Sequence, residues 1–137
     1  MYDPVRWLGE QLDEDERIAR ATDGTVFGLQ LEWFALPEDE AFWKVTNHKG
    51  HLVARQLGPA DAAHIAAHDP ARVLREIEAK RGIVRDYRAA VAKLDDTEVG
   101  TPAHDRATGA VVSLRRAMCL LATTYDARPG FKEEWRP

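Results

Sequence analysis

The feature that most constrains this chain is a long amphipathic pattern over residues 70–95, which begins directly after Asp69-Pro70. Asp is favoured as an N-cap because its carboxylate accepts hydrogen bonds from free N–H groups of the first turn, and Pro at the first helical position loses only an unpaired N–H. Apolar side chains then recur at spacings of three, four or seven, at Val73, Ile77, Val84, Tyr87, Val91 and Leu94. The pattern therefore predicts a helix over 70–95 with one buried face.

A different pattern, partly alternating and rich in β-branched and aromatic residues, precedes this helix. It occupies residues 25–36, 41–47 and 51–57, with turn formers between the segments. These segments predict a meander of three antiparallel strands, in which Gly50 can supply the positive φ of the second hairpin loop. One buried sheet face is predicted to contain Val26, Leu29, Leu31, Trp33, Phe42, Val45, Leu52 and Leu57.

Three further segments have helical signals. Asp3-Pro4 predicts a helix over 4–21 by the same capping argument, and residues 60–68 and 110–125 have helical spacing. Residues 95–109 are predicted to be a surface loop, and residues 126–137 a short tail. With 137 residues and no internal repeat, one domain over 1–137 is expected. We therefore predict an α+β fold, a small antiparallel sheet of about three strands packed against three to four helices, with the 70–95 helix in the centre.

Charge is distributed unevenly, although the net charge is only −4. Residues 1–40 contain eleven acidic and three basic side chains, whereas residues 70–95 contain seven basic and four acidic ones. The arginines of the predicted central helix are Arg72, Arg75, Arg81, Arg85 and Arg88. They could complement the acidic segment within one fold or across a dimer, or they could contact a phosphate. Overall acidity disfavours long-range attraction to nucleic acid, so the first interpretation is preferred.

Histidine is the best candidate for chemistry in this sequence. His64 and His68 are four residues apart on a predicted helix, so both imidazoles can face one ion, and His48 and His51 flank the second hairpin turn. These four residues form a hypothetical site for a divalent metal. Capping and hydrogen bonding at the helix junction would explain the same pattern. The sequence also has no H-E-x-x-H motif, so no general base accompanies these histidines. No other cofactor and no catalytic residue is predicted. The lack of a recognised catalytic motif counts against an enzyme.

The cysteine content and the hydropathy of the sequence indicate in which cellular compartment the protein is expected. The chain has one cysteine, Cys119, in an apolar segment, so an intramolecular disulfide is excluded and a core position is expected. No signal-peptide pattern and no apolar run of membrane-spanning length occurs. We expect a cytoplasmic protein that does not contact the membrane.

These observations favour a non-catalytic interaction or regulatory protein that binds a protein partner or a second copy of itself. The candidate surfaces are the arginine face of the central helix and the aromatic sheet residues Trp33 and Trp43, which core packing would also explain. One alternative is a histidine-based metal-binding protein or small metal-dependent enzyme. A second alternative is a protein that binds nucleic acid through the basic helix.

Two stretches, HIAAHDPARVLREIEAKR and GFKEEWRP, resemble the signatures of an uncharacterised family of short actinobacterial and actinophage proteins, a domain of unknown function. The N-terminal LDEDERIARAT is also similar to that family. The resemblance implies a cytoplasmic accessory protein of bacterial or phage origin, and it implies no activity. In members of the family, a histidine is usual where this chain has Arg128.

Overall fold

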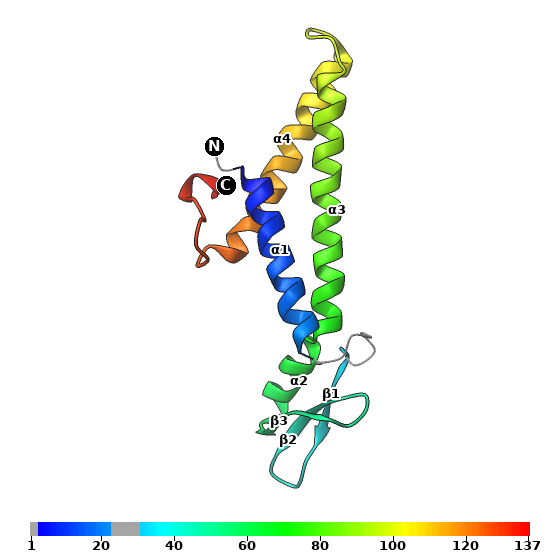
Figure 1. Cartoon of the computed structure of the whole chain (residues 1–137), viewed down its shortest axis with the longest axis vertical. Coiled ribbons are helices and arrows are strands. Elements are labelled where there is room, and N and C mark those ends of the chain that lie inside the picture. The colour runs from blue at the N-terminus through cyan, green and yellow to red at the C-terminus, as the bar shows by residue number, and fades with distance from the viewer. Residues whose placement is uncertain (1–2, 23–30) are drawn as a thin grey trace. The chain divides into compact units, whose positions relative to one another are not determined.

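The computed structural model describes residues 3–22 and 31–137 and has an α+β fold, as predicted (Figure 1). The described helices are α1 Pro4–Ala21, α2 Pro59–Ala67, α3 Pro70–Asp95 and α4 Pro102–Ala122. The strands are β1 Trp33–Pro37, β2 Trp43–Asn47 and β3 Leu52–Leu57, and two 3₁₀ turns follow α4, η1 Thr123–Tyr125 and η2 Glu133–Trp135. The part of the predicted first strand that falls on residues 23–30 lies outside the described residues.

The chain divides into two compact units, which are described separately. The helical unit comprises Met1–Asp13 and Glu78–Pro137, and the sheet unit comprises Glu14–Ile77. The division falls within α1 and α3, and the expectation of one domain over 1–137 stays a prediction. Among the described residues, no helix combines the length and the apolar character needed to cross a bilayer.

Three helices begin with Pro directly after a side chain that caps the first turn. Asp3 Oδ1 accepts a hydrogen bond from Val5 N at 3.0 Å, and Asp69 Oδ1 accepts one from Arg72 N at 2.8 Å. These contacts provide acceptors for N–H groups that have no partner inside the helix. The predicted helices 4–21 and 70–95 therefore match α1 and α3 at both ends.

The start of the last helix was predicted wrongly. Thr101 Oγ1 accepts a hydrogen bond from His104 N at 3.2 Å, and α4 begins at Pro102 instead of residue 110. Thr101-Pro102 carries the same capping signal as Asp69-Pro70, but the surrounding Gly, Asp and Thr residues suggested a loop over 95–109. The actual connection is a short turn in which Gly100 has a φ of +85°.

Removal of the Asp69 carboxylate should destabilise the protein more than removal of the Thr101 hydroxyl. Asp69 Oδ2 also accepts a hydrogen bond from Trp33 N at 3.1 Å, so this one side chain caps α3 and fixes the start of β1. We expect Asp69→Ala to lower the free energy of unfolding by about 2 kcal/mol and Thr101→Ala by about 1 kcal/mol. Urea denaturation followed by circular dichroism measures both. Equal losses would contradict the double role of Asp69.

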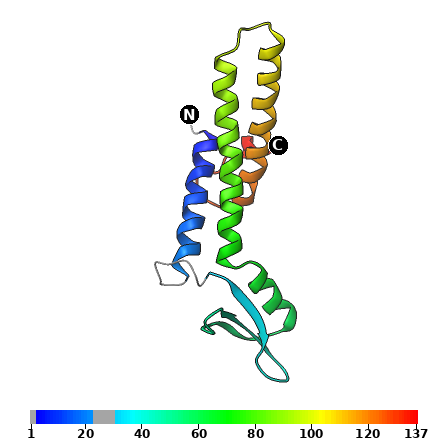
Figure 2. The same ribbon diagram turned by 90° about the vertical axis from the view of Figure 1, so that its right-hand side faces the viewer.

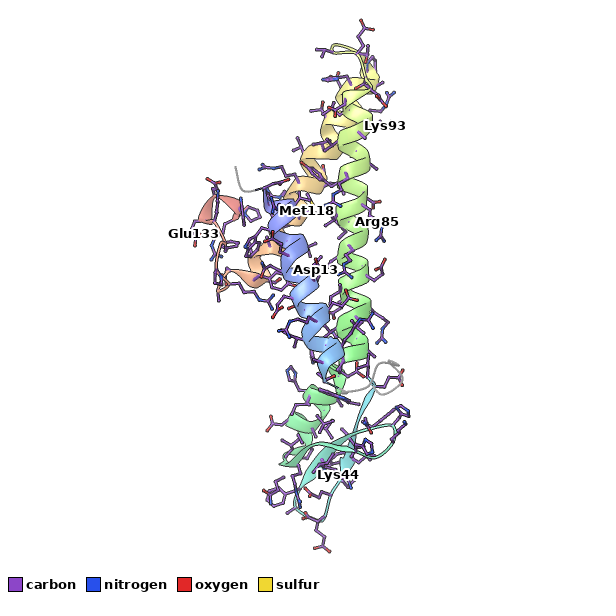
Figure 3. The ribbon with its side chains drawn as sticks, viewed as in Figure 1. Asp13, Lys44, Arg85, Lys93, Met118 and Glu133 are labelled. Atoms are coloured by element: carbon purple, nitrogen blue, oxygen red, sulfur yellow. The ribbon has the colours of Figure 1, made fainter. Side chains whose placement is uncertain are left out.

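In the helical unit, α3 and α4 run antiparallel and side by side, as both views show (Figures 1 and 2). The core contains Leu8, Leu12 and Met118, all without exposed surface, and Val84, which is 6% exposed (Figure 3). The predicted stripe of α3 thus supplies Val84 to a core that α1 and α4 complete. Cys119 is buried, as predicted from its apolar neighbours.

The C-terminal tail of the helical unit is anchored on Trp7 of α1. The Trp7 ring lies 5.3 Å from the Trp135 ring and 5.8 Å from the Phe131 ring, and it is only 1% exposed. Its Nε1 donates a hydrogen bond to the Pro129 carbonyl at 3.0 Å. Gly130 has a φ of +88° and approaches the indole so closely that a Cβ would lie 2.8 Å from Nε1.

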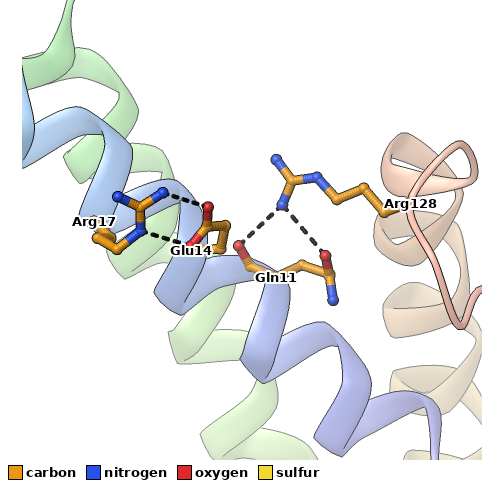
Figure 4. Close-up of polar contacts among 4 residues, drawn as sticks. All are labelled: Gln11, Glu14, Arg17 and Arg128. Carbon is orange, nitrogen blue, oxygen red and sulfur yellow. Dashed lines mark hydrogen bonds and ion pairs between the residues drawn. The ribbon is translucent and has the colours of Figure 1, made fainter.

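A second contact joins the tail to α1. Arg128 Nη1 donates to both the backbone O and the side-chain Oε1 of Gln11 at 3.3 Å (Figure 4). Its guanidinium also lies 4.7 Å from the centre of the Tyr125 ring, a cation–π distance. Arg128 therefore acts as a structural link between the tail and α1.

The sheet unit contains one antiparallel sheet in the order β1-β2-β3, as predicted. Helix α2 packs against β1 and β2 and covers one face of it. Cross-strand partners share a face, so the pairs Trp33↔Asn47, Ala35↔Val45 and Trp43↔Leu57 belong to the covered face. Val45 on this face has no exposed surface.

Strand β3 is irregular. Its pairing with β2 shifts register twice, between Trp43 and Val45 and between Val45 and Thr46, and Gln56 has a φ of +56°. Glu38 holds this segment, because its carboxylate accepts from Gln56 N at 2.9 Å and forms an ion pair with Arg55 at 2.7 Å. The irregular pairing changes which residues of β3 share a face, and no residue pattern in β3 indicates it.

Candidate interaction surface

The four candidate metal ligands lie in two places within the sheet unit. His64 and His68 are on and just after α2 with ring centres 4.3 Å apart, and His68 Nδ1 lies 2.8 Å from the His64 carbonyl oxygen. His48 and His51 are exposed in the turn between β2 and β3. The contact between His68 and the His64 carbonyl is the hydrogen bonding at the helix junction that would explain the pattern without a metal.

The four histidines do not form a shared set of ligands. Within residues 3–22 and 31–137, no group of three or more His, Cys, Asp or Glu side chains is placed to hold a metal ion. The physical reason is that α2 and the β2–β3 turn present their histidines separately. A divalent metal bound by fewer protein ligands stays a prediction.

The five predicted arginines lie along α3, and they divide between the two units. Three form ion pairs at 2.7 to 2.9 Å: Arg72 with Glu76, Arg81 with Asp13 and Arg85 with Glu78. Arg75 and Arg88 are exposed and make no ion pair with a described residue. Acidic side chains already partly neutralise three of the five charges, so binding of nucleic acid by this helix stays a prediction without added support.

The aromatic candidates Trp33 and Trp43 lie on the covered face of the sheet, and both are half-buried. Their neighbours in sequence point the other way, because side chains alternate along a strand. Phe34 pairs with Thr46, Leu36 pairs with Lys44, and Thr46 pairs with Leu52, which defines the opposite face. Phe42, next to Trp43, belongs to this face by the same alternation.

This second face, called here the open sheet face, carries exposed apolar side chains among the described residues, around Thr46 of the middle strand, which is only 5% exposed. It is formed by Phe34, Leu36, Phe42 and Leu52, which are 44%, 43%, 43% and 52% exposed. Val53, which follows Leu52 in β3, is 40% exposed. Soluble proteins expose single apolar side chains routinely, but a contiguous group on one sheet face is typical of an interaction site. Phe42 and Leu52 were predicted to be buried, and the structure corrects both.

Lys44 gives the open sheet face its one central charge among the described residues. Lys44, labelled in Figure 3, lies on β2, the middle strand, opposite Leu36 of β1, and it is half-buried. It makes no ion pair with a described residue. An ammonium group that is partly desolvated and lacks a carboxylate partner is a favourable point for a negative charge from another molecule.

The prediction that Trp33 and Trp43 bind a partner stays a prediction, and the sequence also contains a signal for their neighbours. The segment WFAL is apolar at every position, so it could fill two faces at once, and this signal points to Phe34 and Leu36 as well as to Trp33. For Leu52 no such signal exists, because the irregular pairing of β3 decides its face.

Over residues 1–137 the chain matches a protein family whose description is Family of unknown function (DUF6221). This match confirms the resemblance to an uncharacterised family. No curated protein and no solved structure matches the chain. The function therefore has to be inferred from the surface itself.

Proposed function

This chain belongs to the DUF6221 family of unknown function over residues 1–137, and from its own surface we propose that it is a non-catalytic interaction protein that binds an amphipathic helix of a protein partner. The open sheet face is the binding surface, and its exposed apolar side chains around Lys44 are the observation that carries the proposal. The proposal includes the cytoplasmic location and the bacterial or phage origin that the resemblance implied.

The dimensions of the face favour a helix as its occupant. Three strands of about five residues make a surface of roughly 14 by 17 Å. An α-helix is about 10 Å wide and rises 1.5 Å per residue, so about three turns cover such a surface. A helix already covers the opposite face of the sheet, where the nine-residue helix α2 packs against β1 and β2.

The same dimensions count against a second copy docking face to face. A stable interface buries about 800 Å² on each partner, several times the area of this small sheet. A single helix needs no more area than the sheet offers, and tight binding can come from a few apolar anchors. Lys44 then selects helices that carry an acidic residue within the apolar stripe.

A charge-reversal experiment tests this proposal directly. A phage-displayed library of helical peptides, about three turns long with one apolar face and one randomised position within it, is selected on the wild-type protein. We expect Asp or Glu at the randomised position on the wild type, and Lys or Arg on Lys44→Glu, because opposite charges are favoured at a partly desolvated contact.

The apolar contribution is tested with the double variant Phe34→Ser/Leu52→Ser, which should retain its fold because both side chains are largely exposed. We expect it to lose the selected peptides. Val99→Ser is the matched control, since Val99 is 80% exposed but lies in the helical unit, and it should bind them normally. If the double variant binds as well as the wild type, the open sheet face is not the site. If native mass spectrometry instead finds a wild-type dimer that this double variant abolishes, the occupant is a second copy and the proposal is wrong.

A further inference from the structure

A separate hollow of about 330 Å³ lies in the helical unit between α4 and the C-terminal tail. From α4 it is lined by Val112, Arg115, Arg116 and Cys119, which follow the spacing i, i+3, i+4, i+7. Residues at this spacing share one face of a helix. The opposite wall comes from the tail and includes Trp135 and Arg136. We call this feature the α4–tail hollow.

The rim of the hollow is cationic. Arg115 and Arg116 are exposed, and neither makes an ion pair with a described residue. Arg136 is held in place by Asp126 at 2.8 Å and by Glu133. Hydrogen bonds to Glu133 and Asp126 raise the pKa of Arg136 above its usual value, and the same two carboxylates offset its positive charge.

Glu134 is the acidic side chain in the lining of the hollow, and Asp126 and Glu133 offset the charge of Arg136, so the excess of positive charge comes from Arg115 and Arg116. The wall beneath them is apolar. Trp135 and Cys119 are 3% and 8% exposed, and Val112, at 63%, presents a free apolar surface at the side. The hollow thus places guanidinium groups beside apolar surface, an arrangement that suits a small amphiphilic anion.

We propose that the α4–tail hollow binds a small organic phosphate. Each guanidinium can donate two parallel hydrogen bonds to an oxyanion, so Arg115 and Arg116 together can engage more oxygens than the two of one carboxylate. A phosphate ester has three terminal oxygens, and its organic group would rest on the apolar wall. The volume lies at the lower end of the range for ligand sites, which fits a small molecule and not a polymer.

Phenyl phosphate is a suitable probe, because it combines one phosphate with one apolar ring. By isothermal titration calorimetry at low salt, we expect it to bind the wild-type protein and to lose on the order of tenfold or more in affinity in Arg115→Ala/Arg116→Ala. Arg106→Ala, an exposed arginine on the same helix outside this hollow, should leave the affinity unchanged. Absence of binding to the wild type, or equal binding to the double variant, would overturn the proposal.

Cys119 gives an independent readout of where the probe binds, since it is the chain's single cysteine and lines the hollow. Bound phenyl phosphate should slow alkylation of this thiol by iodoacetamide in the wild type but not in the double variant. Binding without protection would place the probe elsewhere and contradict the assignment. Inorganic phosphate separates the two contributions: it should bind more weakly than phenyl phosphate, and equal affinity would show that the apolar wall is not used.

Discussion

Trp7→Ala is expected to lower the free energy of unfolding by about 3–5 kcal/mol, the largest loss that we predict for a single side chain. Trp7 is almost completely buried and touches the rings of Phe131, Trp135 and Tyr125. Its removal would leave a cavity under the tail and would also remove the hydrogen bond to Pro129 O. The tail and α1 are far apart in sequence, so the packing of Trp7 is a contact that keeps these two segments together.

Urea denaturation followed by far-ultraviolet circular dichroism measures this loss without relying on tryptophan fluorescence. Trp7→Phe is the matched control, because it keeps an aromatic ring but removes the Nε1 donor, and it should lose only about 1–2 kcal/mol. Limited proteolysis should cut the tail of Trp7→Ala faster than that of Trp7→Phe. A tail that stays resistant in Trp7→Ala would show that other contacts anchor it.

Gly130→Ala is the second large effect, and Gly100→Ala is its matched control. Both glycines have a positive φ, +88° and +85°, so an added Cβ causes similar backbone strain of about 1–2 kcal/mol at each. Around Gly100 there is nothing within 4 Å, whereas at Gly130 the Cβ would lie 2.8 Å from Trp7 Nε1. Trp7 is packed on several sides and cannot move away, so we expect a further loss of about 1–3 kcal/mol at Gly130.

The difference between the two glycine variants isolates the close approach of tail and indole from the backbone strain that both share. Thermal or urea denaturation of the two variants and the wild type, under one set of conditions, measures it. Similar losses for Gly130→Ala and Gly100→Ala would mean that the indole moves aside easily, and the tail would then be less firmly packed than described.

Helix boundaries were predictable wherever a capping residue and Pro stood next to each other. Asp3-Pro4 and Asp69-Pro70 fixed the starts of α1 and α3 because both the acceptor and the restricted φ act locally. Thr101-Pro102 carries the same local information, and only the composition of its neighbours obscured it. Local chemistry thus determines these positions, and composition is a weaker guide.

The candidate surface could be predicted only in part, because the faces of a sheet depend on pairing. The strands and their order follow from alternation and turn residues, but Leu52 changes face through two register shifts that involve β2 and β3 together. The α4–tail hollow was equally hidden. Arg115 and Arg116 are adjacent in sequence, but the other wall of the hollow is the tail. The tail is positioned by its packing on Trp7, which the spacing of residues in the sequence does not predict.

The irregular pairing of β3 also affects how the edges of this sheet can pair with strands of other molecules. A sheet border with free backbone groups can recruit strands from other molecules and start fibrils. Here the register shifts and the positive φ of Gln56 distort one border, while Pro37 ends β1 and the Trp33 amide is already bonded to Asp69. Growth by strand addition is thereby discouraged on both sides. Binding through the proposed surface would rely on side chains, so it would not need the strand-to-strand pairing that starts fibrils.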